Sequence, residues 1–346
     1  MTQLFHPELV NDPFGDPGLY VDLQHRNHAL LFDLGDISGL PARKLARLGH
    51  VFVSHTHVDH FCGFDRLLQV LLGQPKRISI TGPAGFIGNV ASRLGSYTWN
   101  LGGEDSVDAA IQAWEYGEDG ALHSALFRFR NAFRREDLPA RKIADGVIVD
   151  EPGYRVTAVH LDHHIPCLGF ALEEKHRLNV WRTRVEQMGL GVGPWLDDLK
   201  QAILDDLPGD TPIAVHWQQH GKSCETVHSL GKLRSLVEIT GGQKIAYVTD
   251  AGFTPDNVAK IIRLAKASDD LFIESAFLEA EAGLALRKMH LTARQAGEIA
   301  RRAGVRRFQL FHFSPRYDGQ PVRLVAEAAD AAGLRPPGTA EPGQEG

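Results

Sequence analysis

Four side chains that can bind a metal ion lie within six consecutive residues, directly after an apolar segment. Residues 48–54 read as a buried strand, and residues 63–72 read as an amphipathic helix. Neutral imidazoles and carboxylates are donors that zinc, manganese and iron accept. A histidine-rich surface loop is the alternative interpretation, and the buried strand before the motif argues against it. The motif therefore predicts a metal site whose donors are His55, His57, Asp59 and His60.

The length and composition are those of a globular protein. The chain has 346 residues and is 43% hydrophobic, which is enough for a large core. We expect one domain over residues 1–330 and a frayed tail over residues 331–346, because the tail is rich in Pro, Gly and Glu. The net charge of −6 gives no general attraction to nucleic acid, so a polyanion would need a local basic patch.

The number of cysteines and the N-terminal sequence both bear on the compartment in which the protein is expected, which is the cytoplasm. Three cysteines make a disulfide framework improbable and leave at least one thiol unpaired, which favours a reducing environment. The N-terminal residues do not show a basic segment followed by an apolar run, so no signal peptide is expected. No apolar run approaches the ~20 residues that span a membrane. We therefore expect a cytoplasmic protein without a membrane partner.

Strand-like apolar segments end repeatedly in a histidine or a carboxylate. Loops held by a rigid sheet are where α/β proteins assemble sites from residues distant in sequence. The order of elements suggests two strand-rich halves with helices outside, which predicts an α/β fold in helix–sheet–sheet–helix layers. The residues that follow such segments are His55, the run from His160 to His164, Asp250, Glu274 and His312.

Three further segments carry predictions. Residues 18–34 read as a hairpin; Asp33 at its end either caps a turn or orients a ligand histidine, and we favour the second role. Residues 104–119 read as an acidic helix. Residues 126–142 interleave basic residues with phenylalanines. That pattern indicates either an edge strand whose charges discourage aggregation or a strip that contacts phosphates, and we favour the edge strand.

Five segments together resemble one known superfamily. They are HTHVDH at residues 55–60, a histidine before CLGF at 167–170, YVTDA at 247–251, HLTARQAGEIA at 290–300 and LFHFSPRY at 310–317. Over residues 18–320 the chain resembles the metallo-β-lactamase superfamily, and within it the ribonuclease Z group, zinc phosphodiesterases that trim the 3′ ends of precursor tRNA. HTHVDH indicates only the superfamily, whereas the later motifs are typical of the phosphodiesterase branch. The resemblance implies an αββα sandwich of two mixed β-sheets flanked by helices.

The resemblance implies a dinuclear metal site with nitrogen and oxygen donors and one bridging carboxylate. Two zinc ions are the first expectation, with manganese or iron as alternatives. His163 is preferred over His164 as a ligand because its spacing to Gly169 matches the family pattern. The implied ligands are His55, His57 and His163 for one ion, Asp59, His60 and His312 for the other, and Asp250 as the bridge.

The resemblance also implies roles in catalysis. Asp59 would accept the proton of the attacking water, and His290 would donate to the leaving oxygen or stabilise charge on phosphorus. Glu274 would orient His290, and the alternative for Glu274 is a cap on the next turn. For Arg316 a structural ion pair is an alternative of equal weight. The implied phosphate contacts are Thr292, Ser314 and Arg316.

The substrate stays open between tRNA and a smaller phosphodiester. Residues 196–207 are acidic and should repel an RNA backbone. A hydrolase of a lactone or thioester on the same scaffold is less favoured, because its site would not need His290 or the Ser-Pro-Arg-Tyr run. A non-catalytic binding protein is least favoured, because the implied ligand set is complete. The resemblance further implies a homodimer.

Overall fold

The computed structural model describes residues 4–24, 28–100, 103, 106–175, 177–219 and 221–333. Within them the chain forms two compact units: a larger one over residues 4–149, 156–172 and 244–333, and a smaller one over residues 150–155 and 173–243. The expected frayed tail lies outside the described residues from residue 334 onward. The single domain expected over residues 1–330 stays a prediction.

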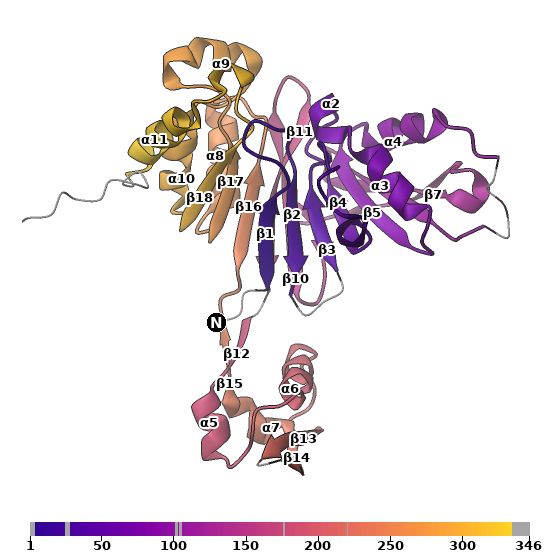
Figure 1. Ribbon diagram of the computed structural model, residues 1–346, viewed down its shortest axis with the longest axis vertical. Coiled ribbons are helices and arrows are strands. Elements are labelled where there is room, and N and C mark those ends of the chain that lie inside the picture. Colours follow the sequence, from indigo (N-terminus) through magenta and orange to yellow (C-terminus); the bar gives the residue numbers. More distant parts are fainter. Residues whose placement is uncertain are drawn as a thin grey trace, which may run out of the picture. The chain divides into compact units, whose positions relative to one another are not determined.

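The larger unit contains an eight-stranded sheet whose strands lie in sequence order (Figure 1). Its strands are β1 (Phe5–Leu9), β2 (Leu19–Leu23), β3 (Ala29–Phe32), β4 (Leu48–Phe52), β5 (Arg77–Pro83), β6 (Ala110–Tyr116), β7 (Ala121–Arg128) and β8 (Arg135–Lys142). Strands β3 to β6 pair in parallel, and the flanking pairs are antiparallel. The carboxyl ends of the parallel strands therefore meet at one edge, where the histidine motif follows β4.

A second sheet of six strands has the order β18-β17-β16-β11-β10-β9. Its strands are β9 (Val147–Asp150), β10 (Tyr154–Asp162), β11 (Pro166–Glu174), β16 (Lys244–Val248), β17 (Asp270–Glu274) and β18 (Arg307–Phe311). Strands β16, β17 and β18 are parallel. Their carboxyl ends lead to Asp250, Glu274 and His312, so one edge of this sheet also collects the predicted site residues.

Helices cover the outer faces of both sheets (Figure 1), and aromatic rings of the two sheets contact one another between them. Rings of Phe32 and Phe52 from the first sheet each lie 5.7 Å from that of Phe170 in the second. The predicted helix–sheet–sheet–helix layering is thus confirmed. The helices on the first sheet are α1 (Ala42–Leu45), α3 (Phe64–Leu71) and α4 (Phe86–Gly95); those on the second are α8 (Pro255–Ala265), α10 (Ala293–Ala303) and α11 (Pro321–Ala332). Two further helices are α2 (Val58–Phe61) and α9 (Ala282–Lys288).

The smaller unit has a core of its own, built around the buried Trp195. Four acidic side chains are exposed along or just after its helix α6, and Trp195 opens that helix. In the described part of the chain, no helix is long and apolar enough to cross a membrane. The elements of this unit are β12 (Arg177–Val180), α5 (Arg182–Gln187), α6 (Trp195–Leu204), β13 (Pro212–Gln219), β14 (Lys222–Ser229), α7 (Leu230–Leu233), the 3₁₀ turn η2 (Arg234–Leu236) and β15 (Val237–Thr240).

Most predicted elements are confirmed, and one is wrong. The hairpin over residues 18–34 is β2 and β3, although its turn at residues 25–27 lies outside the described part. Of the helix expected over residues 104–119, residues 104 and 105 lie outside the described part, and residues 110–116 instead form strand β6, which pairs with β5 and β7 and packs under α4. Residues 126–142 contain β8, the outermost strand of its sheet, as the edge-strand interpretation expects.

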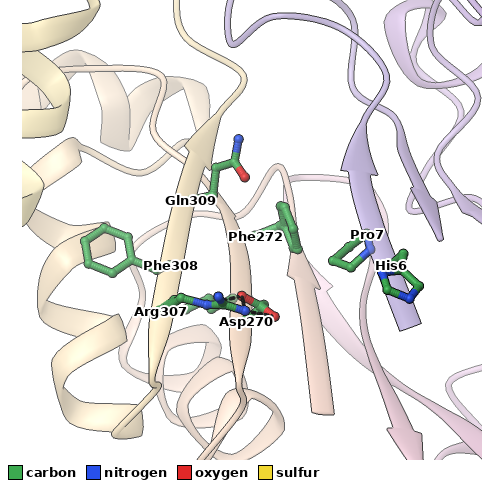
Figure 2. Close-up of a pocket in the computed structure, with 8 residues that line it drawn as sticks. His6, Pro7, Asp270, Phe272, Arg307, Phe308 and Gln309 are labelled. Carbon is green, nitrogen blue, oxygen red and sulfur yellow. Dashed lines mark hydrogen bonds and ion pairs between the residues drawn. The ribbon is translucent and has the colours of Figure 1, made fainter. Parts of the chain in front are cut away.

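A pocket of about 440 Å³ lies beside β1, at the amino ends of β17 and β18 (Figure 2). Its Arg307 donates to Asp270 at 2.8 and 3.0 Å, so the two charges neutralise each other. The predicted site residues follow the opposite, carboxyl ends of the same strands. This pocket is therefore separate from the candidate site.

We expect Gly297→Ala to lower the free energy of unfolding by about 1–3 kcal/mol. A Cβ at Gly297 would lie 2.1 Å from the carbonyl oxygen of Ala328, so α10 and α11 would have to separate. Gly88→Ala in α4 is the matched control, because nothing lies within 4 Å of its Cβ position. It should stabilise the protein by roughly 0.5–1 kcal/mol. Urea unfolding measures both, and equal effects at the two positions would contradict this account of the helix contact.

Candidate metal centre

Segments that follow strands of both sheets bring the site residues to one place. His55 and His57 follow β4, while Asp59 and His60 lie on α2, which begins directly after His57. The second sheet contributes the remaining residues. They are His163 from the β10–β11 turn, Asp250 after β16, Glu274 at the end of β17 and His312 after β18.

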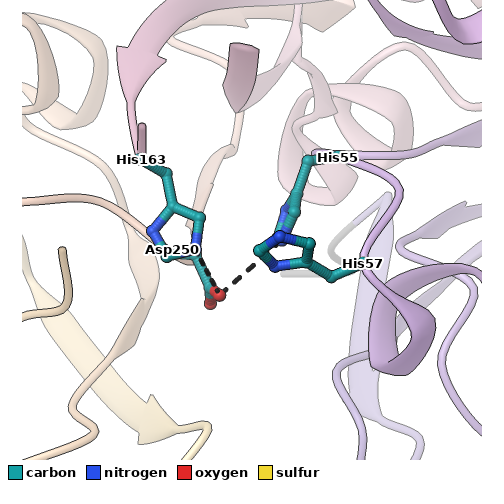
Figure 3. A group of neighbouring side chains, drawn as sticks. All are labelled: His55, His57, His163 and Asp250. Carbon is teal, nitrogen blue, oxygen red and sulfur yellow. Dashed lines mark ion pairs between the residues drawn. The ribbon is translucent and has the colours of Figure 1, made fainter. Parts of the chain in front are cut away.

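One group of four donors surrounds a common point (Figure 3). Donor atoms of His55, His57, His163 and Asp250 all lie within 4.8 Å of one another. Nε2 of His55 is 3.7 Å and Nε2 of His163 is 3.4 Å from Oδ2 of Asp250. Three imidazoles and one carboxylate are a donor set that a divalent transition metal accepts.

A second group faces the other oxygen of the same carboxylate. Asp59, His60 and His312 form this group, with Nε2 of His312 3.2 Å from Oδ2 of Asp59. Oδ1 of Asp250 lies 3.5 Å from Nε2 of His60 and 2.9 Å from Nδ1 of His312. Because each oxygen of Asp250 faces a different group, the geometry is that of a carboxylate between two cation positions.

His290 lies beside the two groups and is held by Glu274. Nδ1 of His290 is 2.9 Å from Oε2 of the fully buried Glu274 and 3.9 Å from Oδ1 of Asp250. Burial lowers the pKa of His290, but the charge of Glu274 and its hydrogen bond outweigh burial and raise that pKa above its ordinary value. The contact with Glu274 thus favours the protonated form of His290, which is the form that a proton donor needs.

Several ring nitrogens fit a metal ion better than they fit a protein partner. Among the described residues, Nε2 of His55 and Nε2 of His60 are buried without a hydrogen-bond partner. Buried polar atoms are otherwise nearly always paired, because an unpaired one loses its hydration without compensation. Both nitrogens point toward carboxylate oxygens at distances too long for a hydrogen bond. The residues present thus fit a bound divalent cation.

The electrostatic field also favours a cation. Burial lowers the pKa of His55 to about 2, which keeps its imidazole neutral and able to coordinate. Burial likewise acts to lower the pKa of His60, but the carboxylates of Asp250 and Asp33 outweigh it and raise that pKa to about 10. The two carboxylates thus create a negative potential at His60 that also favours a metal ion.

Asp33 is the hub that orients the imidazoles. It is fully buried, adopts φ 60°, and its carboxylate accepts from Ser54 N at 2.6 Å and Ser54 Oγ at 2.9 Å. Nδ1 of His60 is 3.0 Å and the hydroxyl of Tyr247 is 2.9 Å from Oδ2 of Asp33. Ser54 Oγ also lies 3.1 Å from Nδ1 of His55. The contact of Asp33 with His60 agrees with the role predicted for Asp33, whereas Ser54 and Tyr247 were not predicted; their only signal in the sequence is that they lie close to predicted ligands.

The remaining candidate residues from the sequence belong to neither group. His164 is exposed with φ 60° and lies outside both groups. Thr292 is buried, caps α10, and donates from Oγ1 to Glu279 at 2.5 Å. Ser314 precedes the 3₁₀ turn at Pro315–Tyr317. Arg316 is paired with Glu281, in line with the ion-pair alternative.

Comparisons with known proteins give a consistent relationship. The chain is 29% identical over 331 residues to the ribonuclease Z of Deinococcus radiodurans, covering 93% of this chain and 94% of that one. It is 31% identical over 321 residues to the ribonuclease Z of Thermobifida fusca, covering 89% and 82%. No family model matches.

Solved structures show the same fold. The metallo-β-lactamase fold protein YhfI from Bacillus subtilis aligns over 95% of both chains, with a TM-score of 0.53 and 14% identity. A long-form RNase Z from yeast aligns over 90% of this chain and 38% of that one, with a TM-score of 0.50 and 13% identity. The predicted metallo-β-lactamase-like fold is confirmed.

We expect Tyr247→Phe to lower the free energy of unfolding of the metal-free protein by about 1.5–3 kcal/mol, because it removes a hydrogen bond to a buried charged group. Tyr20→Phe is the control: Tyr20 is equally buried, but its hydroxyl makes one long hydrogen bond, 3.4 Å, to the carbonyl of Lys44. Denaturant unfolding of the two variants compares them directly. A loss at Tyr247 no larger than at Tyr20 would show that the Asp33 hub does not need its hydroxyl.

Proposed function

Because the chain belongs to the ribonuclease Z family and is a metal-dependent hydrolase with a phosphodiesterase site, we propose that it cleaves a phosphodiester near the 3′ end of a precursor tRNA. The observation that carries this proposal is the His290–Glu274 pair, 2.9 Å apart, beside Asp250. A histidine that gives its proton at this position would suit a poor leaving group such as a ribose oxygen. A lactone or thioester hydrolase would have less use for it.

The proposed reaction is attack of water on phosphorus with cleavage of the bond to the leaving oxygen. Asp59 accepts a proton from the attacking water, and His290 gives its proton to the leaving oxygen. Glu274 holds the His290 ring and stabilises its charged form before transfer. When bound, two divalent ions supply a clamp on the phosphoryl oxygens and a lower pKa for the water.

We assign the two cation positions to zinc, with manganese or iron as alternatives, because the donors are imidazole and carboxylate. One position would use His55, His57 and His163, the other Asp59, His60 and His312, with Asp250 between them. The family resemblance supports a homodimer. A cytoplasmic location is supported by the three cysteines, which are all free thiols.

The smaller unit also exposes basic side chains outside the acidic residues 196–207. Arg182 and Arg184 are exposed on α5, which carries the exposed Glu186 as well. Trp181, 44% exposed, has the guanidinium of Arg184 5.1 Å from its ring centroid. An exposed indole with arginines suits stacking and phosphate contact in RNA. We propose that this basic side of α5 contacts tRNA.

The first test is His290→Ala on a 3′-extended tRNA and on bis-p-nitrophenyl phosphate, with zinc or manganese added. We expect loss of about 10²–10⁴ in kcat on tRNA, because proton donation to a ribose oxygen is lost. The loss on the small diester should be smaller, because nitrophenolate leaves without a proton. His164→Ala is the control and should leave both rates unchanged.

The outcomes separate the candidates. Wild-type activity on the small diester alone would discard tRNA and keep the phosphodiesterase. No activity on either substrate, with two metal ions bound per chain, would contradict the phosphodiesterase proposal and favour a lactone or a thioester as the substrate.

The second test is the double variant Arg182→Glu/Arg184→Glu. We expect its kcat/KM on tRNA to fall at least tenfold at ~0.1 M salt, because two favourable phosphate contacts become repulsive. Its rate on bis-p-nitrophenyl phosphate should not change. The matched control is Asp197→Lys/Asp198→Lys on α6. If only the α6 variant alters tRNA cleavage, the contact surface has been assigned to the wrong helix.

A further inference from the structure

Asn257 is a fully buried amide whose donors and acceptor are all engaged by the main chain. It lies in the first turn of α8, where Thr254 Oγ1 accepts from its backbone N–H at 3.2 Å. Its Oδ1 accepts from Asp162 N at 2.9 Å. Its Nδ2 donates to the carbonyls of Asp162 and Gly252, both at 2.9 Å. With one N–H and two carbonyls around it, the side-chain amide can adopt only one orientation.

These backbone groups belong to two segments that carry members of one donor group. Asp162 directly precedes His163, and Gly252 follows Asp250 by two residues. The segments also bond directly, since Gly252 N donates to the carbonyl of Asp162 at 3.1 Å. The resulting separation of Nε2 of His163 from Oδ2 of Asp250 is 3.4 Å. Asn257 therefore fixes the main chain on both sides of that contact.

We propose that Asn257 is a positioning residue that holds the His163 and Asp250 segments at the separation one divalent ion requires. The proposal rests on the metal centre of the proposed function. Asp33 orients His60 through its ring, whereas Asn257 acts on the main chain and contacts no donor atom. Its effect should fall mainly on the group of His55, His57, His163 and Asp250, because two of those donors come from the segments that Asn257 holds, whereas the other group shares only Asp250.

Asn257→Asp changes the chemistry with almost no change of shape. The carboxylate keeps the bond from Asp162 N but turns an oxygen toward the carbonyls of Asp162 and Gly252, which repels both. Asn257→Ala is the second variant, because it removes the contacts without repulsion. Asn11→Asp is the matched control: Nδ2 of Asn11 also joins two carbonyls, of Asp16 and Asp36, each at 2.8 Å, in segments without a donor residue.

The experiment is a zinc titration of the metal-free full-length chain against a competing chelator, repeated with cobalt to record its visible spectrum. For wild type we expect two equivalents per chain. For Asn257→Asp one equivalent should bind about 10–100-fold more weakly, and for Asn257→Ala the loss should be smaller. Asn11→Asp should match wild type. Circular dichroism at the titration temperature confirms that each variant is folded, so a merely structural role would leave the zinc affinity unchanged.

Failure can be assigned to its source. Wild type binding two zinc ions with both Asn257 variants equal to it would overturn this inference and leave the proposed function intact. An equal loss in Asn11→Asp would also overturn it, because the effect would then be that of any added carboxylate. Wild type binding no zinc would overturn the metal centre and the inference together.

Discussion

The two oxygens of Asp250 face different groups of imidazoles, and the rest of the site depends on that division. Oδ2 lies closest to the ring nitrogens of His55 and His163, while Oδ1 lies closest to those of His60 and His312. A carboxylate buried this deeply costs free energy unless positive charge lies close to it. Cations bound beside the carboxylate would meet that requirement. They would also tie segments of both sheets together, and metal binding would then be coupled to folding of this edge.

The two groups are supported by different means, and the reason lies in the elements that carry them. His60 lies on a helix, where its main chain is already fixed by helical hydrogen bonds, and only the ring needs orienting. Asp33 does this, with Ser54 and Tyr247 fixing the carboxylate in turn. His163 lies on a tight turn, where the main chain itself needs support, and a buried amide beneath the turn supplies it.

Features that depend on residues close together in the sequence could be predicted, and features that depend on contacts between distant residues could not. The histidine motif and the strand before it are local, and both were readable. Strand ends rich in His, Asp and Glu also pointed to the right edge, since parallel strands align their carboxyl ends. The spacing to Gly169 favoured His163 over His164, and the turn geometry gives the physical reason. His164 adopts a left-handed backbone conformation, and its side chain belongs to neither donor group. Pairings such as Thr292 with Glu279 join a 3₁₀ turn to the start of a helix, and no local pattern encodes them.

The helix predicted over residues 104–119 was wrong because contacts with distant strands outweigh the local preference. Residues 104–119 have a helical composition by local preference, yet β6 is flanked on both sides by strands that need its backbone groups. Pairing on two edges satisfies the main chain of every residue in the strand, and packing under α4 buries its apolar face, which together outweigh a weak helical preference. The charged positions were the misleading signal. In the sequence these charges flank residues 110–114. The side chains of the strand that pack under α4 are Ile111 and Ala113, which lie between the charged positions.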